Sequence, residues 1–455
     1  MPAIIPPVVN GFSQLKKNDG YVLYLSVIIL IVVLIYGSII LSSYQQNLGI
    51  PRRKLNRLQA KAAAYSGLQL GTTLVENKLS GDDSLTDSSN RFEIGNSSHC
   101  IVSIGAKNSW VVVRSQGVSG RDTAVFEGVL GHKLPYTDTF ALGVINSGNG
   151  LVIADRAVLT GNAAVKNGQI VVRGSGAFSG KKVELPVWQF DDRLYRRQIS
   201  TICSTFAVAM NNCLTIDSLT KFDTHSIGRN RNEDWYLKGA MCLAGASTDT
   251  LDFRDKTIWL IGSVVVKGGI VLKNLNLNIS GTITVSDSVV LNNVFLNCIG
   301  TVKIEKKSSA QVNIACTDTV LITDDARILY PSVIYAASVP SREASNNPDA
   351  CILVRSGATV TGTVLIPFGG DKPMFFTAPR AQFEGFLFSN APVTLHGEVR
   401  GVVYAKSTHY TSGNDSYNCW LMDVDVRFRD IKGMVFPYVF FKQQAEPCYL
   451  TITEL

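Results

Sequence analysis

The sequence predicts a mainly β protein, in which one N-terminal transmembrane helix, extended by an amphipathic helix, precedes a β-helix (solenoid) with an inserted subdomain. Three observations lead to this fold class. A charge-free apolar run lies near the N-terminus, apolar residues later recur with a period of 18 to 19, and the composition suits strands and turns. Charged residues make up only 17% of the 455 residues and 38 are glycine, whereas a helical protein would carry more Glu, Lys, Ala and Leu.

The apolar run, residues 21–41, predicts a membrane-spanning helix. It reads YVLYLSVIILIVVLIYGSIIL and contains no charged residue. At 1.5 Å per residue such a helix is about 31 Å long, which matches the hydrocarbon core of a bilayer. A cleaved secretory signal would have a shorter apolar core followed by a small-residue cleavage site, but this run continues into SSYQQNLGIPRRK. We therefore expect an uncleaved single-pass anchor.

Residues 42–79 predict an amphipathic extension of that helix. Apolar side chains recur there at spacings of three and four, which places them on one helical face. Gly67 and Gly71 form a small-xxx-small pair on which another helix could pack closely. Packing of this segment against the chain's own β-domain is the alternative. The apolar positions are Leu55, Leu58, Ala62, Tyr65 and Leu68.

The N-terminal segment resembles the type IV pilin and type II secretion pseudopilin superfamily. KKNDG, ending at Gly20, precedes the apolar run like a prepilin leader, and AKAAAYSGLQLGTTLVENKL (60–79) is similar to the alanine-rich segment of PilX-type minor pilins. The chain departs from the family at Tyr21, where Phe is usual, and at Leu25, where major pilins carry Glu. The resemblance implies that residues 1–20 are a leader or a cytoplasmic segment and that a peptidase cuts between Gly20 and Tyr21.

The strongest periodic signal lies in residues 270–326. Slid by 19 and then by 18 residues, the apolar positions fall into five columns, with Gly281 and Gly300 at an expected corner. This period describes coils of two or three short strands that stack and bury one another's apolar rows. Asparagines beside the columns suit turns and ladders between coils. The columns are Leu275/Val294/Val312, Leu277/Leu296/Ile314, Ile279/Cys298/Cys316, Ile283/Val302/Val320 and Val285/Ile304/Ile322.

Related patterns extend the predicted solenoid to residues 141–183 and 251–410. Gly161 and Gly180 lie 19 apart, and Gly362, Gly385 and Gly401 each precede an apolar triplet at irregular spacings. These glycine-apolar coils resemble those of bactofilins, which are small cytoskeletal β-helices that polymerise end to end.

Three segments lie outside the repeats. Residues 80–140 are expected to hold a polar linker and the first strands. Residues 184–250 break the pattern and are richer in charge, which predicts an insertion or lateral subdomain. Residues 411–455, in which 419–448 alternate aromatic and charged side chains in short strands, are expected to cap the last coil because a solenoid needs closed ends.

Nine cysteines and five histidines are scattered without a C-x-x-C motif, so no metal site is expected. Cys203 and Cys213 are spaced to close a small loop, as a disulfide, in an oxidising compartment. Cys298 and Cys316 share a column. Stacked strands lie about 4.8 Å apart, near the Cα separation that a disulfide tolerates, so a disulfide and two buried thiols both remain open.

No catalytic or cofactor-binding residues are predicted. The sequence has no P-loop, no H-E-x-x-H and no acidic cluster that recurs across the coil columns. The formal net charge is +7, and its one dense basic cluster, within residues 52–61, suits a juxtamembrane flank. Because no basic and aromatic stripe is present, we expect no nucleic-acid partner.

We therefore expect a non-enzymatic, membrane-anchored envelope protein, similar to a minor pilin or pseudopilin, that acts by assembly or surface contact. Its partners would be the membrane, other pilin-like or envelope subunits, and further copies of itself. The resemblance implies a single-pass protein of the bacterial inner (cytoplasmic) membrane with a periplasmic or extracellular β-domain.

The basic residues on the two sides of the anchor favour the opposite orientation. Lys16 and Lys17 precede it and five basic residues follow, which by the positive-inside rule places the β-domain in the cytoplasm. This orientation would suit a membrane-tethered, bactofilin-like scaffold, which is the first alternative. A surface β-helix protein that binds or degrades carbohydrate is a second, less favoured alternative.

Overall fold

The computed structural model describes residues 19–80, 88–95, 98–107, 110–133, 140–146, 148, 150–166, 168–185, 199–206, 214–221, 234–245, 249–336, 351–412, 415–428, 434–437 and 446–455. The protein is mainly β, with 60% of the described residues in strands, a solenoid of about 11 turns and one N-terminal apolar helix. The predicted fold class is confirmed.

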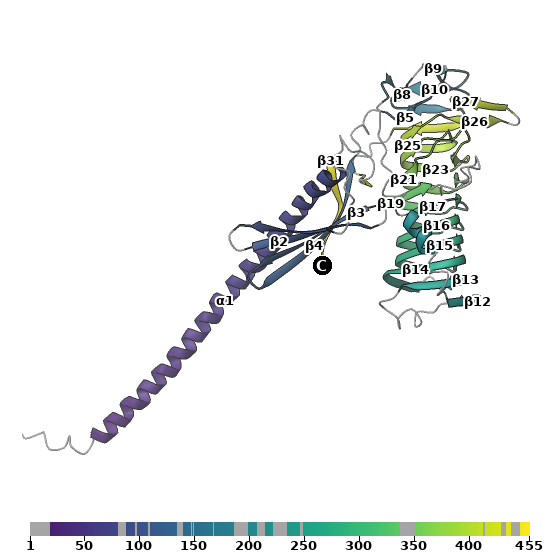
Figure 1. Ribbon diagram of the computed structural model, residues 1–455. Coiled ribbons are helices and arrows are strands. Elements are labelled where there is room, and N and C mark those ends of the chain that lie inside the picture. Colours follow the sequence, from purple (N-terminus) through teal and green to yellow (C-terminus); the bar gives the residue numbers. More distant parts are fainter. Residues whose placement is uncertain are drawn as a thin grey trace, which may run out of the picture.

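The N-terminal helix, α1 (Asp19–Ser80), is 62 residues long and continues through Pro51 without a break. At 1.5 Å per residue it is about 93 Å long, and its first half projects alone from the rest of the molecule (Figure 1). The segment Tyr24–Tyr44 has a mean hydropathy of 2.8, and none of it is buried. By length and composition this helix could cross a membrane, either as an anchor or as a signal sequence.

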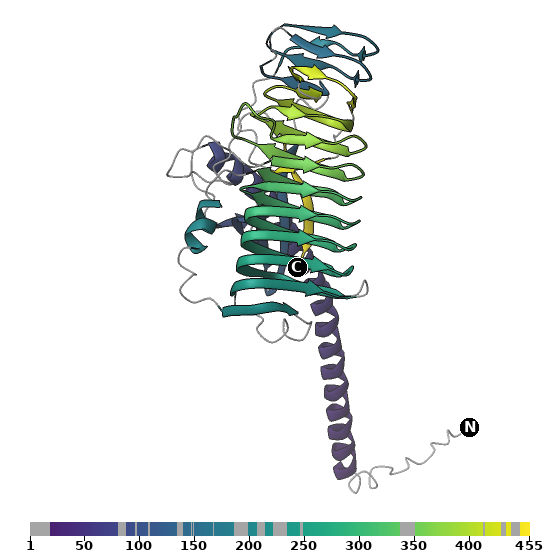
Figure 2. The ribbon, with the colours of Figure 1, turned by 90° about the vertical axis from the view of Figure 1, so that its right-hand side faces the viewer.

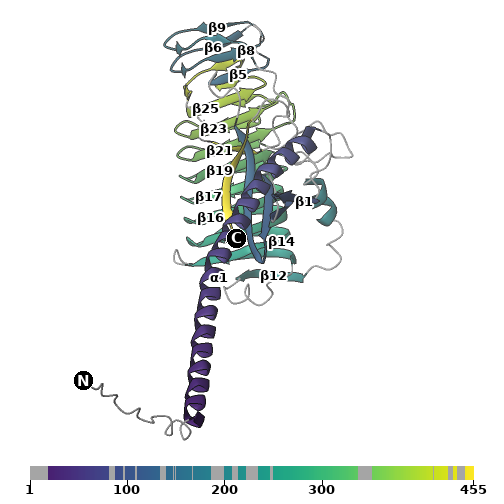
Figure 3. The same ribbon diagram turned by 90° about the vertical axis from the view of Figure 1, so that its left-hand side faces the viewer.

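The second half of α1 lies across an antiparallel sheet (Figure 3). The sheet follows the chain in the order β1, β2, β3 and β4, and β30 and β31 from the C-terminus both pair with β4. Residues 80–140 therefore contain a sheet of their own and not only a linker and the first strands. The strands are β1 (Ser88–Ile94), β2 (Ser98–Lys107), β3 (Trp110–Ser119), β4 (Asp122–Lys133), β30 (Phe436–Pro437) and β31 (Glu446–Glu454).

The remaining strands form the solenoid, whose parallel strands stack in regular coils (Figure 2). In chain order they are β5 (Leu142–Val144), β6 (Gly150–Ile153), β7 (Val158–Thr160), β8 (Ala163–Val165), β9 (Gln169–Val172), β10 (Ala177–Ser179), β11 (Lys182–Val183), β12 (Leu214–Lys221), β13 (Trp235–Ala244), β14 (Thr250–Lys267), β15 (Val271–Val285), β16 (Val290–Ile304), β17 (Ser309–Cys316), β18 (Thr319–Ile322), β19 (Arg327–Ala336), β20 (Cys351–Val354), β21 (Thr359–Ile366), β22 (Phe375–Thr377), β23 (Gln382–Ser389), β24 (Val393–Thr394), β25 (Gly397–Ala405), β28 (Trp420–Leu421) and β29 (Val424–Arg427). A short hairpin, β26 (His409–Ser412) and β27 (Asp415–Asn418), branches from it.

The register of the stack confirms all five predicted columns. Leu275 pairs with Val294, which pairs with Val312, and the other four columns are aligned in the same way. The later glycines, Gly362, Gly385 and Gly401, also share one register. The column residues are almost fully buried and belong to one continuous core inside the solenoid. Stacked coils thus bury one another's apolar rows, as the period predicts.

Each regular coil turns at three corners. In the coil of β15 these are Asn274 and Gly281, which both have positive φ, and the turn at Asp287 that leads to β16. Gly281 is aligned with Gly262 and Gly300 in the neighbouring coils. A Cβ on any of these glycines would collide with the carbonyl oxygen of the glycine before it, so this corner requires glycine.

The order of coils in the stack differs from their order in the sequence. The long series from β12 to β25 ends where β25 pairs with both β29 and β5. β29 and β5 lie far apart in the sequence, yet they supply successive parts of one coil. From there the stack continues through β7 and β10. The coils of residues 142–183 form its far end, whereas β12 lies at the end nearer the projecting half of α1 (Figures 2 and 3).

Two predicted boundaries are corrected by this arrangement. Within residues 184–250, predicted as an insertion or lateral subdomain, β12 and β13 are coils of the solenoid. Within residues 411–455, predicted as a cap, β28 and β29 continue the solenoid and β31 leaves it to pair with β4. A strand of this length satisfies its backbone at any open sheet edge, and the sequence does not say which edge it meets.

A second apolar cluster joins the solenoid to the rest of the molecule. Helical residues 199–206 and the strand β30 cover one outer face of the coils. Phe206 contacts Trp259 edge to face at 5.4 Å, and Phe436 contacts Phe386 at 5.5 Å. The Tyr330 hydroxyl accepts a hydrogen bond of 2.7 Å from the Val435 N–H. The sheet and this face of the solenoid are therefore packed together through aromatic side chains.

Candidate functional site

The surface that distinguishes this molecule is the long exposed side of α1. Its first half is exposed over the whole described apolar segment. A large exposed apolar surface of this kind marks contact with a membrane or another protein. The Gly20–Tyr21 bond, the predicted processing site, lies in the first turn of α1, and processing itself stays a prediction.

The second half of α1 is held on the sheet by small residues. Ala60, Ala64, Gly67 and Gly71 are buried, and they bring the helix backbone close to β2 and β3. A Cβ on Gly67 would collide with the Ser115 hydroxyl, and one on Gly71 with the Val113 side chain. The glycine pair therefore packs against the chain's own sheet, which is the alternative that the sequence left open.

The sheet contributes the matching small residue. Gly117 of β3 faces the helix, and a Cβ there would collide with the Ala60 carbonyl oxygen and the Ala64 nitrogen. Further contacts border this close approach: Ser119 donates a 2.9 Å hydrogen bond to the Gln59 side chain, and Lys61 forms a 2.7 Å ion pair with Glu454. Small residues on both partners thus set the distance between helix and sheet.

The predicted apolar face of residues 42–79 is only partly the buried one. Leu68 is buried, but the other four positions point to solvent, with Leu55 exposed by 54%, Leu58 by 65% and Tyr65 by 50%. The periodicity of large side chains favoured this face, whereas the sheet selects the alanines and glycines because only they allow close approach. An apolar stripe of Leu55, Leu58, Ala62 and Tyr65 therefore remains uncovered beyond the membrane-length segment.

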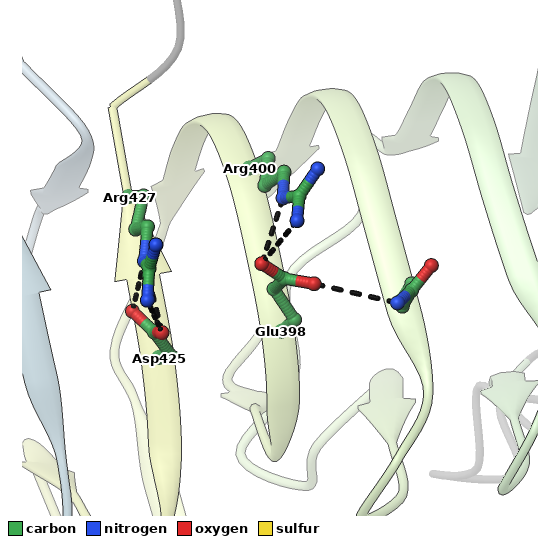
Figure 4. A network of polar contacts seen from close by, with 5 residues as sticks. Glu398, Arg400, Asp425 and Arg427 are labelled. Carbon is green, nitrogen blue, oxygen red and sulfur yellow. Dashed lines mark hydrogen bonds and ion pairs between the residues drawn. The ribbon is translucent and has the colours of Figure 1, made fainter.

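The open face of the solenoid carries paired charges (Figure 4). Arg400 donates to Glu398 of the same strand at 2.7 Å, and Arg427 donates to Asp425 at 2.9 Å on the next coil. Gln382 of the preceding coil donates to Glu398 at 3.4 Å. Each carboxylate thus has a guanidinium partner, and such exposed pairs contribute little to stability.

A second polar line follows the turns of the solenoid. Asp287, Lys306 and Asp324 occupy equivalent turns of successive coils, and Lys306 pairs with Asp287 at 3.2 Å. These turn residues line a shallow, open depression. Within the described residues, no group of three or more His, Cys, Asp or Glu side chains is arranged to hold a metal ion.

Asparagine ladders support two other positions, as the sequence suggested. Asn293 donates to Asn274 and Asn297 donates to Asn278, each at 2.8 Å. The first ladder extends to Asp252, which accepts from Asn274 at 2.9 Å. That hydrogen bond, with one from the Arg254 backbone, lowers the pKa of Asp252.

The cysteines of the third column are two free, buried thiols. Cys298 contacts the Gly281 carbonyl oxygen at 3.3 Å, and Cys316 contacts the Gly300 carbonyl oxygen at 2.8 Å. Their mutual contact and their burial raise the pKa of Cys298. Cys203 is half-buried and Cys213 lies outside the described residues, so the predicted disulfide between them remains a prediction.

No protein-family model matches this sequence, and no match was found among curated proteins. Among solved structures, the chain is similar to the competence-associated pilin ComZ from Thermus thermophilus, at 10% sequence identity and a TM-score of 0.21. The alignment covers 88% of this chain and 97% of that one. At this level of similarity the comparison assigns neither a family nor a function.

Proposed function

We propose that this protein is a minor-pilin-like or pseudopilin-like subunit of the bacterial envelope, which acts by assembly and surface contact and not by catalytic turnover. The observation that carries the proposal is the division of α1. One continuous helix is apolar and exposed in its first half, and in its second half it packs on an antiparallel sheet through a stripe of small residues. The leader-like KKNDG segment before it supports the same function.

The uncovered stripe on the second half of α1 suits assembly with another helix. Leu55 and Leu58 lie within the basic cluster that follows the membrane-length segment, and Tyr65 lies beyond it, so the apolar surface continues along the helix through this cluster. Burying apolar surface contributes about 25 cal/mol per Å², so a neighbouring helix along this stripe would stabilise an assembly of such subunits. The partner subunit would be another pilin-like protein or a second copy of this chain.

We place α1 in the cytoplasmic membrane, with the sheet and the solenoid on the outer side of that membrane. The resemblance of the N-terminus to prepilins supports this orientation, whereas the five basic residues after the apolar run oppose it by the positive-inside rule. A membrane-tethered scaffold would instead have its β-domain in the cytoplasm. The side of the membrane on which the β-domain lies therefore distinguishes the pilin-like subunit from the scaffold.

The first test is topology of the full chain in intact spheroplasts. A membrane-impermeant maleimide should label cysteines introduced at exposed positions of the sheet and the solenoid, by Arg91→Cys and Arg173→Cys, in cells that have not been lysed. An added protease should reach both parts from outside, and N-terminal sequencing should begin at Tyr21. A protected β-domain together with an N-terminus at Met1 would overturn the proposal.

The second test concerns the helical stripe. A cysteine introduced by Leu58→Cys should form cross-linked species in the membrane with a bifunctional maleimide, because the proposal places a neighbouring helix there. The matched control is Arg91→Cys, at an exposed position of β1. Equal cross-linking at both positions would contradict a specific contact along the stripe.

A further inference from the structure

Five aromatic rings form a continuous line along one edge of the solenoid. The ring centroids of Phe376 and His396 are 5.8 Å apart, and those of His396 and Tyr410 are 5.4 Å apart. The line continues to Tyr417 at 6.5 Å and from there to Trp420 at 5.0 Å. We call these five residues the aromatic ladder, and we propose that it binds an extended glycan chain.

An arginine lies over the ring at each end of the ladder. The Arg355 guanidinium lies 5.9 Å from the Phe376 centroid, and that of Arg173 lies 5.4 Å from the Trp420 centroid. Both arginines are exposed, and neither forms an ion pair with another described residue. A stacked guanidinium keeps N–H groups free at its edge, so both ends of the ladder offer donors to sugar hydroxyls.

Hydrogen bonds hold the middle of the ladder in place. The Tyr410 hydroxyl donates to Asp423 at 3.2 Å, and Arg156 donates to the other oxygen of that carboxylate at 2.8 Å. Burial and the nearby Asp423 raise the pKa of Tyr410, so its hydroxyl keeps the proton that it donates. Rings held in this way lose little conformational entropy when a ligand stacks on them.

His396 acts in the ladder as a neutral ring. Burial lowers the pKa of His396, and the Asp423 charge only partly opposes this effect. Its backbone is fixed from both sides, since its N–H donates to the Thr377 hydroxyl and its carbonyl accepts from that same hydroxyl, each at 2.8 Å. The uncharged imidazole therefore continues the apolar line between Phe376 and Tyr410.

The ladder is accessible and lies far from the helix. Tyr410 is buried at its centre, but the other four rings keep part of their surface exposed. The hairpin of β26 and β27, which carries Tyr410 and Tyr417, points to the side of the solenoid opposite α1 (Figure 1). A subunit anchored by α1 would thus present the ladder away from its assembly surface.

The geometry favours a glycan over other ligands of aromatic sites. Coils stack about 4.8 Å apart, so the rings form a line and not a cage around a small cation. Single-stranded nucleic acid also stacks on aromatic rings but needs a basic groove. Here Arg156 is neutralised by Asp423, and Asp155 lies close enough to raise the pKa of Tyr410. Pyranose rings, by contrast, offer an apolar C–H face to the aromatic rings and hydroxyls to the arginines and carboxylates.

The test is direct binding to the full chain in detergent micelles, by isothermal titration calorimetry. The probes are cellohexaose and chitohexaose, which share β-linked pyranose rings and differ in N-acetylation, and a single-stranded oligothymidine of similar length. At least one hexasaccharide should bind with a dissociation constant in the millimolar range or below. Comparison of cellohexaose with chitohexaose shows whether the acetamido group contributes to binding.

Variants then locate the site. Trp420→Ala and Arg173→Gln should each weaken hexasaccharide binding by about fivefold, since a stacking contact is worth roughly 1 kcal/mol. Arg114→Gln, at an exposed arginine of β3, is the matched control for Arg173→Gln and should bind as the wild type does. Arg173 is exposed, so its replacement leaves folding intact even where Trp420→Ala does not. Binding of neither hexasaccharide, binding of oligothymidine alone, or unchanged binding by Arg173→Gln and a folded Trp420→Ala would each overturn the proposal.

Discussion

The Tyr449 hydroxyl donates a hydrogen bond of 2.6 Å to the carbonyl oxygen of Leu68, so the last strand of the chain is bonded directly to the first helix. Thr72 in turn donates to the Tyr449 hydroxyl at 3.0 Å. Burial raises the pKa of Tyr449 to about 12, so the hydroxyl keeps its proton at any physiological pH. The ring also covers Gly128 of β4, where a Cβ would lie 2.5 Å from it.

Tyr449→Phe is therefore expected to lower the free energy of unfolding by about 1 to 2 kcal/mol, because the variant keeps the ring and loses the hydrogen bonds. Chemical denaturation followed by circular dichroism measures the change. Tyr36→Phe, at an exposed position in the projecting half of the same helix, is the control and should have no effect. Equal stability of both variants would show that the hydrogen bonds of the Tyr449 hydroxyl contribute nothing.

Gly117→Ala is expected to separate α1 from the sheet. The added Cβ would collide with helix backbone at Ala60 and Ala64, which cannot move aside as a flexible side chain can. We expect a loss of at least about 2 kcal/mol, with increased proteolysis between α1 and β1. The control is Gly37→Ala, whose Cβ meets nothing within 4 Å and which should leave the sheet intact. A Gly117→Ala protein with wild-type stability would contradict the close packing.

Gly300→Ala is expected to be among the most damaging single substitutions in the solenoid. Gly300 has φ of 142°, and its Cβ would collide with the Gly281 carbonyl oxygen of the preceding coil. Both the strained backbone and the collision oppose folding, so we expect a loss of roughly 3 kcal/mol or more. Gly95→Ala, with φ of 70° and open space around it, should cost only about 1 kcal/mol. Thermal unfolding of the two variants compares them, and similar midpoints would refute the requirement for glycine at this corner.

Acidification below neutral pH should destabilise the protein through His396. Burial lowers the pKa of this imidazole in the folded state, whereas the unfolded imidazole takes up a proton as the pH falls through about 6.5. The unfolded state then binds more protons, so the free energy of unfolding decreases below that pH. Urea unfolding between pH 7.5 and 5.5 should show this decrease, and His396→Gln should show less of it. An identical pH dependence in the variant would assign the effect to other groups.

The buried Cys298 and Cys316 and the half-buried Cys351 should resist thiol reagents until the solenoid unfolds. Burial raises the pKa of Cys351 to about 11, which leaves only about one thiolate in a thousand at pH 8. Cys298 and Cys316 are almost fully buried, so the reagent cannot reach them in the folded protein. Mass spectrometry after brief labelling with iodoacetamide should find these three unmodified in the native protein and fully modified in urea. Rapid native labelling of Cys316, or its recovery as a disulfide with Cys298, would contradict the arrangement.

The repeats could be predicted from the sequence because one physical pattern determines them. Inward residues such as Leu275 and Val294 must be apolar and must align, so the period of the sequence is the period of the stack. The corner at Gly281 was predictable for the same reason, since only glycine fits where successive coils approach closely.

The order of the coils could not be predicted in this way. Any coil of matching period can stack on any other, so nothing in the residues around Leu142 indicates that β5 pairs with β25. The pairing of β31 with β4 could not be predicted for a similar reason, because an open sheet edge accepts many strands.

The packing face of α1 was also predicted incompletely. The periodicity of the sequence pointed to the large residues Leu55 and Leu58, whereas alanines and glycines form the contact with the sheet. The aromatic ladder combines residues from several coils and the hairpin, and no local motif marks it.

The meeting of β29 and β5 in one coil has a consequence for biosynthesis. The strands at Leu142 leave the ribosome early, but the edge on which they stack, at Val403, is made near the end of translation. β4 is likewise synthesised long before β31, the strand that pairs with its edge. Neither unit can therefore complete its sheet during synthesis, and early strands keep open edges of the kind that aggregate. Only a chain that includes β29 and β31 closes the open edges of the solenoid and of the antiparallel sheet. A truncated product keeps these edges exposed, so chaperones and proteases should recognise it before it reaches its final location.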